Sequence, residues 1–296
     1  MLISSIILHP DWIMRRYAGW KTVYEDENCL VLGKGHFPLR RICVLSSVSS
    51  SNLFARIKLA RFRSWTTIFS LKFIPSDDAA ISPARSQGLT LTPDSQRMFH
   101  KFTFIIDLTS TIDQLWMAMR PTNRNLCNKA NQSGVQVRVE NAPSAFDVDQ
   151  FISLYSEMAR TRGLAIPQRS VLMKMFADGR LILGCAERDG VVLSMALCYL
   201  AGETAMYLYG VSSSRSVDGA GQLLQWEMMQ ALKAHGTTKY DLGGVPRVEE
   251  SDGIFKFKKG FGGLGIELGP EFYWLPVWVQ IFRRLRQWLQ RRNSPV

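Results

Sequence analysis

The sequence predicts an α+β protein, because strand-like and helix-like segments alternate from residue 102 onward. Residues 102–108 and 134–140 have the alternating apolar pattern of strands. Residues 147–162 and 221–234 instead place apolar side chains at helical spacing. After residue 140 the order is helix, helix, three strands, helix and strand. This order indicates a mixed sheet with a helix between its last two strands.

Capping residues and turn residues set the ends of these segments. Residues 109–111 offer N-caps for a helix, and Pro121 should interrupt it before a second helical piece at 123–133. Gly236 is suited to end the helix at 221–234. The remaining expected elements are a helix at 169–177, strands at 181–187, 191–200 and 205–211, and a strand at 239–244.

The first hundred residues predict short strands joined by loops. Apolar runs at 29–32, 42–45 and 66–74 alternate with clusters of Gly, Pro and Ser. Residues 56–63 are basic and can form an exposed helix face, for which no role is predicted.

The composition is that of a folded, basic protein. Of its 296 residues 46% are apolar, and Lys and Arg outnumber Asp and Glu by 36 to 25, for a net charge of +11. The excess favours polyanionic partners such as tRNA, anionic lipid or a pyrophosphate-bearing precursor. A basic surface that serves only solubility is the alternative. Because the cations are spread along the chain, no nucleic-acid arm and no DNA partner are expected.

Cysteine usage and hydropathy favour a cytoplasmic protein. The five cysteines form no CxxC pair, so neither a disulfide framework nor a zinc site is expected. Residues 1–10 are too short to span a bilayer and lack the features of a signal peptide. No window approaches the roughly 18 apolar residues of a membrane-spanning helix. We expect a cytoplasmic location, at the inner face of the cell membrane.

Residues 240–263 carry the candidate chemistry. Asp241 ends a strand, and the glycines after it allow a backbone to approach a ligand closely. Residues 257–263 then combine two lysines with phenylalanines and glycines. A lysine there can hold a phosphate or stabilise an oxyanion in acyl transfer. A basic hairpin with a Gly-rich turn is the purely structural alternative.

The segments KYDLGG and DGIFKFKKGFGG resemble the signature of the FemAB family of peptidoglycan-bridge aminoacyltransferases. The resemblance covers roughly residues 65 to 270 and is most specific at 222–263. It implies two GNAT-like domains, each a mixed sheet flanked by helices, with a trimmed and degenerate first domain. The expected ranges are 1–140, 141–262, and a return segment with a basic amphipathic tail at 263–296.

The resemblance also implies a set of site residues. Lys258, beside Phe257, matches the family lysine that contacts the precursor's phosphate or the reacting carbonyl, and Asp241 is expected to orient the amine or accept its proton. Arg124 lies in a segment similar to the family's basic helix, which here lacks one cation. Tyr209 ends a central strand and is expected to line the groove. The residues expected to bind substrate are Phe257, Lys256, Gly243, Gly244, Tyr209 and Arg124.

The donor substrate depends on residues 215–221. CoA-using GNAT enzymes bind pyrophosphate with a glycine loop at a helix N-terminus. Gly219 and Gly221 fit such a loop, but Arg215 lies one residue too far away. The expected donor is therefore aminoacyl-tRNA, with acyl-CoA as the alternative, and no tightly bound cofactor or metal is expected.

The leading hypothesis is an N-acyltransferase that moves an aminoacyl group from tRNA to an amine on a peptidoglycan or other envelope precursor. The alternatives are an acyl-CoA-dependent N-acyltransferase acting on an envelope sugar or small amine, and a non-catalytic GNAT-like module that binds an acidic or membrane partner. GNAT-type chemistry needs no covalent nucleophile, because the amine attacks the activated carbonyl directly. Residues 274–292 combine apolar side chains and arginines on a helix that can contact an anionic membrane or pack on the first domain.

Overall fold

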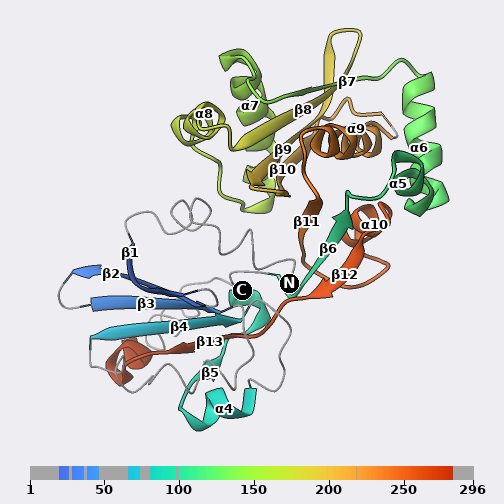
Figure 1. Cartoon of the computed structure of the whole chain (residues 1–296). Helices are drawn as coiled ribbons and strands as arrows, with labels where there is room; N and C mark the ends of the chain where they lie inside the picture. Colours follow the sequence, from blue (N-terminus) through green and yellow to red (C-terminus); the bar gives the residue numbers. More distant parts are fainter. Residues whose placement is uncertain are drawn as a thin grey trace, which may run out of the picture. The chain divides into compact units, whose positions relative to one another are not determined.

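The computed structural model describes residues 20–26, 29–36, 39–46, 66–73, 81–97, 100–217 and 219–282. The chain divides into two compact units, each with its own sheet (Figure 1). The first unit comprises Ile3–Lys101 and Glu267–Val296, and the second comprises Phe102–Ile266. Both sheets are mixed and flanked by helices, so the α+β prediction is confirmed. The basic residues 56–63 and the tail beyond residue 282 lie outside the described residues.

The first unit is built on a six-stranded sheet in the order β1-β2-β3-β4-β13-β5. β3 and β4 run parallel, whereas the other neighbours are antiparallel. Its described elements are β1 (Lys21–Asp26), β2 (Cys29–His36), β3 (Leu39–Ser46), β4 (Thr67–Phe73), α4 (Ile81–Ser86), β5 (Thr90–Leu91), the 3-10 turn η3 (Asp94–Gln96) and β13 (Glu271–Trp274). β13 comes from the far end of the chain, so the chain returns to the first sheet after completing the second.

A buried ion pair links β13 to β4. Lys72 and Glu271 are direct partners in the antiparallel register, and their side chains are paired and nearly inaccessible to solvent. A buried charge without its partner is strongly unfavourable. The pair therefore favours this register of β13 over a slipped one.

The second unit is a seven-stranded sheet in the order β12-β6-β11-β10-β9-β8-β7. Its strands are β6 (Phe102–Asp107), β7 (Gln136–Glu140), β8 (Leu181–Arg188), β9 (Val191–Ala201), β10 (Thr204–Ser212), β11 (Lys239–Val245) and β12 (Leu264–Glu267). Its helices are α5 (Ile112–Ala118), α6 (Pro121–Gln132), α7 (Ala145–Arg162), α8 (Arg169–Ala177), α9 (Ala220–Ala234) and α10 (Gly253–Lys259). The helices expected at 147–162, 169–177 and 221–234 are thus α7, α8 and α9.

Helices cover both faces of the second sheet. Residues 192–201 of β9 are buried without interruption, although successive side chains of a strand point to opposite faces. In Figure 1, α9 lies across one face, and α7 and α8 lie on the other. α9 contacts β7, β8, β9 and α6, whereas α8 contacts β8 and α7 contacts β10.

The unit boundaries differ from the expected ranges of 1–140 and 141–262. Residues 102–140 belong to the second unit, because β6 pairs with β11 and β7 pairs with β8. These partners lie far along the chain, and local patterns in 102–140 do not reveal them. The second expected boundary also moves, because β12 at 264–267 still belongs to the second sheet.

β10 and β11 separate partway along their length. They pair in parallel from Thr204 and Lys239 to Met206 and Asp241, and their pairing ends there. Immediately beyond Met206, the register of β10 against β9 shifts between Tyr207 and Tyr209, as in a β-bulge. Such a bulge bends a strand. The bend and the lost pairing open a space between two neighbouring strands.

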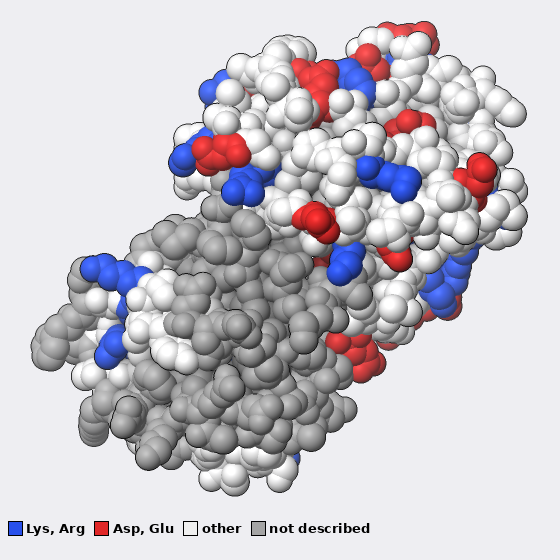
Figure 2. Space-filling model, in the orientation of Figure 1, with Lys and Arg blue, Asp and Glu red and all other residues white. Residues whose placement is uncertain are grey.

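Figure 2 shows cations and acids interspersed over the second unit. No described helix is long and apolar enough to cross a bilayer. No disulfide joins the five cysteines, all of which are buried.

Candidate active site

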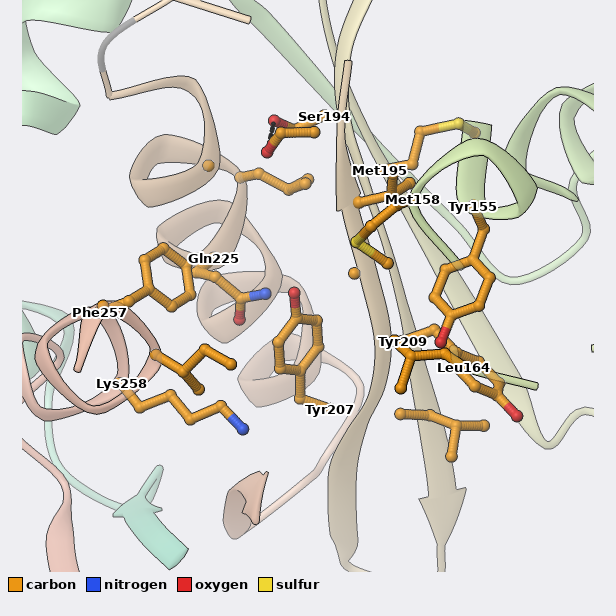
Figure 3. Close-up of a pocket in the computed structure, with 18 of the residues that line it drawn as sticks. Tyr155, Met158, Leu164, Ser194, Met195, Tyr207, Tyr209, Gln225, Phe257 and Lys258 are labelled. Carbon is orange, nitrogen blue, oxygen red and sulfur yellow. Dashed lines mark hydrogen bonds between the residues drawn. The ribbon is translucent and has the colours of Figure 1, made fainter. Parts of the chain in front are cut away.

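A pocket of about 510 Å³ lies in the second unit beside the separated part of β10 (Figure 3). β9, β10, α7, α9 and α10 contribute its lining, together with Leu164 after α7. The lining contains two charged side chains, Arg162 and Lys258, and neither Asp nor Glu. Such a pocket favours neutral or anionic groups over cations.

The helix α10 brings the Phe257 and Lys258 motif to this pocket. Asp252 caps the helix, because its side chain accepts a hydrogen bond of 2.8 Å from the backbone N–H of Phe255. The helix ends at Gly260. The structural alternative for this motif, a basic hairpin with a Gly-rich turn, is corrected: residues 257–259 are the last turn of a helix. The cap at Asp252 explains the difference.

Lys258 is buried, with only 8% of its surface exposed. Its Nζ donates hydrogen bonds to the carbonyl oxygens of Gly243 at 3.0 Å and Gly244 at 2.9 Å. It also lies 5.7 Å from the centre of the Tyr207 ring (Figure 3). Gly243 has a φ of +74°, and a Cβ there would lie 2.9 Å from the carbonyl oxygen of Tyr207. A side chain at 243 would therefore disturb the bend that holds the lysine.

The charge of Lys258 is sensitive to pH near neutrality. Burial lowers the pKa of its ammonium to about 8, and the nearby carboxylate of Asp241 opposes that fall. Below pH 8 the side chain is mainly a cation, and above pH 8 it is mainly a neutral amine.

Asp241 supports the bend and does not line the pocket. Its Oδ1 accepts hydrogen bonds from the hydroxyl of Thr103 and from the N–H of Gly243 at 2.8 Å. Burial raises the pKa of Asp241, and the two hydrogen bonds and the charge of Lys258 oppose the rise. Asp241 and Lys258 thus converge on Gly243, one at its N–H and the other at its carbonyl. The geometry makes Asp241 a positioning residue, and the expectation that it handles the substrate's proton finds no support in it.

Tyr207 and Gln225 line the pocket and were not predicted from the sequence. Buried hydrogen bonds connect Gln225 to residues deeper in the protein. The Tyr240 hydroxyl donates to the Gln225 side-chain oxygen at 2.7 Å and lies 3.1 Å from the Cys198 sulfur. Burial raises the pKa of the Tyr207 phenol, which a hydrogen bond with Gln225 partly offsets. Tyr207 is therefore a neutral hydrogen-bonding group at physiological pH.

Gly210 provides the space for Tyr207. A Cβ on Gly210 would lie 1.5 Å from the Tyr207 hydroxyl oxygen, which real atoms cannot tolerate. The sequence signal was a glycine inside a strand, which often marks a close approach of another group.

An aromatic wall forms the opposite side of the pocket. Tyr209 lines it and meets Tyr155 of α7 edge to face, with ring centres 5.2 Å apart. Met158 and Arg162 follow Tyr155 along α7 at helical spacing. The helical spacing at 147–162 predicted only an amphipathic helix, and periodicity alone does not distinguish a core face from a pocket wall.

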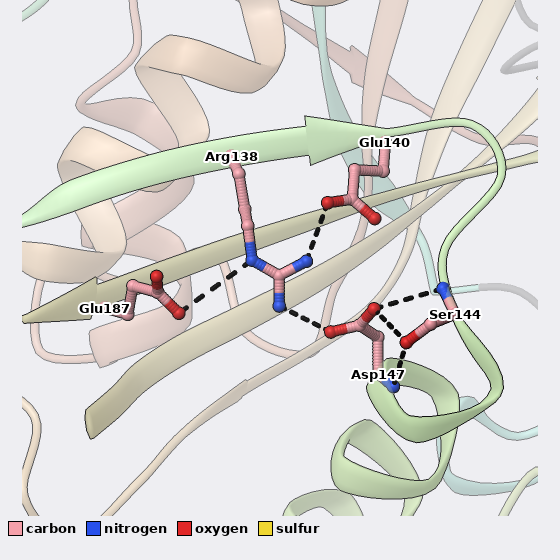
Figure 4. A network of polar contacts seen from close by, with 5 residues as sticks. All are labelled: Arg138, Glu140, Ser144, Asp147 and Glu187. Carbon is pink, nitrogen blue, oxygen red and sulfur yellow. Dashed lines mark hydrogen bonds and ion pairs between the residues drawn. The ribbon is translucent and has the colours of Figure 1, made fainter. Parts of the chain in front are cut away.

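A charge network holds α7 in place (Figure 4). Arg138 of β7 contacts the carboxylates of Glu140, Asp147 and Glu187. Asp147 and Ser144 also form a reciprocal capping box at the start of α7. Burial by itself would raise the pKa of Asp147, but hydrogen bonds from Arg138 and Ser144 outweigh it and lower the pKa.

Besides Asp241, five expected residues lie outside the pocket lining: Gly243 and Gly244, whose carbonyls hold Lys258, and Lys256, Arg124 and Gly219. Lys256 is exposed on α10, and the Arg124 guanidinium contacts the sulfur of Met117 at 3.0 Å. Gly219 has a φ of +90°, and a Cβ there would lie 2.1 Å from the carbonyl oxygen of Leu126. The packing of α9 on α6 therefore explains why position 219 is a glycine.

The remaining expected residues, Phe257 and Gly221, do line the pocket. The Phe257 ring meets the Phe261 ring edge to face at 5.1 Å, and a Cβ on Gly221 would be 3.8 Å from the Phe257 ring. A hydroxyl pair that was not predicted, Ser194 and Ser212, also lines the pocket, with oxygens 3.0 Å apart. No cluster of His, Cys, Asp or Glu in the described part of the chain can hold a metal ion.

Replacing Asp147 with alanine is expected to lower the free energy of unfolding by about 1–2 kcal/mol, because the cap and the Arg138 contact are lost. The pKa of Asp147 is lower in the folded protein than in the unfolded chain, where it is near 4. The contribution of Asp147 to the free energy of unfolding is therefore complete above about pH 4 and disappears as the pH falls through the folded-state pKa. Urea unfolding at several pH values measures both effects. Asp149→Ala, which breaks an exposed pair with Arg169, should change stability by less than about 1 kcal/mol. Equal effects of the two variants would contradict the assignment.

Replacing Thr103 with valine is expected to lower the pKa of Lys258 further. Asp241 loses a hydrogen bond and is protonated more easily, which weakens its support of the ammonium. A carbon-13 NMR titration of labelled lysines measures this pKa, with the Lys258 signal assigned from Lys258→Met. Thr103→Ser keeps the hydroxyl and should titrate like the wild type. If the pKa of Lys258 were unchanged in the valine variant, the charge of Asp241 would not be what supports the Lys258 ammonium.

Replacing Gly210 with alanine is expected to cost about 1–3 kcal/mol of stability, because the Tyr207 ring must move. Urea unfolding measures the loss. Gly253→Ala is the matched control, since a Cβ at the start of α10 meets nothing within 4 Å. If both variants were equally stable, the packing of Tyr207 against Gly210 would be wrong.

Comparisons with known proteins agree with the motifs. Residues 118–259 match the family model described as an acetyltransferase (GNAT) domain. The chain is 26% identical over 187 residues to the UDP-N-acetylmuramoylpentapeptide-lysine N(6)-alanyltransferase of Weissella viridescens, covering 58% of this chain and 55% of the relative. It is 38% identical over 82 residues to a lipid II:glycine glycyltransferase of Staphylococcus epidermidis, covering 26% of this chain and 20% of the relative. The aligned parts thus span about half or less of the curated relatives.

Solved structures share the fold at low sequence identity. The crystal structure of FemX superposes with a TM-score of 0.65 at 17% identity, covering 92% of this chain and 94% of that chain. The C-terminal domain of a putative lysylphosphatidylglycerol synthetase from Agrobacterium fabrum gives a TM-score of 0.61 at 12% identity, covering 91% and 89%. Sequence motifs, family match and fold together confirm the resemblance to the FemAB family, in a chain whose residues 118–259 match a GNAT acetyltransferase domain.

Proposed function

We propose that the protein transfers an aminoacyl group from aminoacyl-tRNA to an amine on a cell-envelope precursor, and that the pocket of the second unit is the reaction site. The observation that carries the proposal is the buried Lys258 ammonium, fixed at a pocket that has no carboxylate in its lining. The similar proteins from Weissella and Staphylococcus are named as an alanyltransferase acting on a muramoylpentapeptide lysine and a glycyltransferase acting on lipid II.

In this reaction the acceptor amine attacks the ester carbonyl directly. A C–N bond forms and the ester C–O bond breaks, and the proton lost by the amine ends on the departing ribose hydroxyl. Negative charge develops on the carbonyl oxygen in the transition state, where a fixed cation is most effective. Lys258 uses two N–H bonds on the carbonyls of Gly243 and Gly244, which leaves the third for that oxygen.

The surrounding residues orient the reacting groups. Tyr207 and Gln225 are neutral hydrogen-bonding groups next to Lys258, and the chain through Tyr240 holds Gln225 in one orientation. Phe257 and Tyr209 supply aromatic surface to the pocket lining. When bound substrates displace water from the pocket, the interaction between the ammonium and the developing charge becomes stronger.

The glycine loop before α9 favours tRNA over CoA as the donor. Gly219 is required by the close approach of Leu126, so its presence does not point to a pyrophosphate site. An acyl-CoA-dependent N-acyltransferase is the second candidate, because Ser194 and Ser212 place hydroxyls in the pocket near the start of α9, where phosphates bind well. A non-catalytic module would not need a buried lysine at the pocket.

The purified protein, incubated with charged tRNA or with acetyl-CoA and with lysine-containing muropeptide precursors, tests the donor and the acceptor together. Mass spectrometry of the precursor should show an added aminoacyl group with charged tRNA. An acetyl product would select the second candidate, and no product with any donor would refute both.

Replacing Lys258 with methionine is expected to reduce the transfer rate by about 10²–10³-fold, because the oxyanion loses its cation. The wild-type rate, corrected for the fraction of unprotonated acceptor amine, should fall as pH rises through about 8, where Lys258 loses its charge. Initial rates at saturating donor measure both. Lys259→Met is the matched control, since Lys259 pairs with Glu250 on the surface. A corrected rate that rises through pH 8 would indicate a neutral lysine acting as a base.

A further inference from the structure

The register of the first sheet gathers exposed cations at one end. Lys21 of β1 pairs with Gly33 of β2, and Lys34 of β2 pairs with Arg41 of β3. Arg40 is adjacent, and all four cations are exposed. Figure 2 shows cations over β2 and β3. No Asp or Glu occurs among the described strand residues at this end.

Exposed apolar side chains lie at the same end. β13 ends at Trp274, which pairs with Phe69 near the start of β4, and the start of β4 pairs with Arg40 of β3. Residues 277–282 are then helical. Within it Val277, Ile281 and Phe282 are 68%, 54% and 64% exposed, whereas Val279 is 8% exposed. The helix therefore buries one side and presents apolar side chains to solvent on the other.

The cations and the helix belong to one surface of the first unit. β3 and β13 are two strand positions apart, a spacing of about 10 Å. We propose that this sheet end, defined by Lys21, Lys34, Arg40, Arg41 and the helix 277–282, docks on an anionic lipid bilayer. The apolar side chains would enter the interface between headgroups and acyl chains, and the cations would contact lipid phosphates.

Charge and apolarity together favour a bilayer over other partners. A nucleic acid would match the cations but offers no apolar layer for Val277, Ile281 and Phe282. A second copy of the chain in a two-fold arrangement would bring like cations together. An anionic bilayer satisfies both parts of the surface. This docking is independent of the transfer chemistry, and the two proposals can fail separately.

Cosedimentation of the full chain with vesicles tests the proposal. Binding is expected to vesicles of phosphatidylglycerol and phosphatidylcholine, to weaken with added salt, and to be much weaker with phosphatidylcholine alone. The double variant Arg40→Gln and Arg41→Gln should lose about fivefold in affinity for each cation removed, on the order of 25-fold together. Lys174→Gln with Arg188→Gln removes the same charge from the second unit and should bind like the wild type.

A second variant tests the apolar part. Ile281→Ser with Phe282→Ser changes side chains that are more than half exposed, so the fold should persist while vesicle binding weakens. Equal losses in the two double cation variants would show a general charge effect and overturn the proposal. A different outcome would assign this surface to nucleic acid: the wild type does not bind vesicles but binds tRNA, and the Arg40 and Arg41 double variant loses the tRNA binding. Concentration-dependent dimers that the serine variant abolishes, again without vesicle binding, would assign it to a second copy.

Discussion

The site depends on one interaction, the hydrogen bonds from the Lys258 ammonium to the carbonyl oxygens of Gly243 and Gly244. A buried cation is unfavourable unless polar groups replace its lost water. Here backbone carbonyls do so, and they are available because β11 is free of β10 beyond Asp241. A fully paired β10 and β11 would use those backbone groups in the sheet. The local loss of sheet pairing is therefore what allows a lysine to be buried at the pocket.

The same bend links the lysine to residues that never reach the pocket. Thr103 of β6 donates to Asp241, Asp241 accepts from the N–H of Gly243, and the Gly243 carbonyl accepts from Lys258. Each of these hydrogen bonds gives a partner to a buried polar group that would otherwise be destabilising. The opposing pKa shifts of Asp241 and Lys258 follow from this shared environment, in which burial disfavours both charges and each charge favours the other.

Local patterns in the sequence were sufficient for most elements of the second unit and for part of the site. Helical periodicity located α7, α8 and α9, and the motif around Phe257 and Lys258 located the pocket's cation. Residues whose role depends on distant contacts were not predictable in this way: Thr103 acts through a hydrogen bond across 138 residues, and Tyr207 depends on the space left by Gly210. Lys256 and Arg124 were included because they are cations within matching motifs, but a motif does not specify which side of a helix faces a pocket.

The path of the chain connects the lysine-bearing helix to the first sheet. After α10 the chain forms β12 in the second sheet and, after three intervening residues, begins β13 between β4 and β5 of the first. β13 is fixed there by the buried pair of Lys72 and Glu271. A slip of β13 in its register would separate Glu271 from Lys72 and leave a buried charge without its partner. The register of the returning segment is therefore fixed within the first sheet itself, and no residue of that sheet lines the pocket of the second unit.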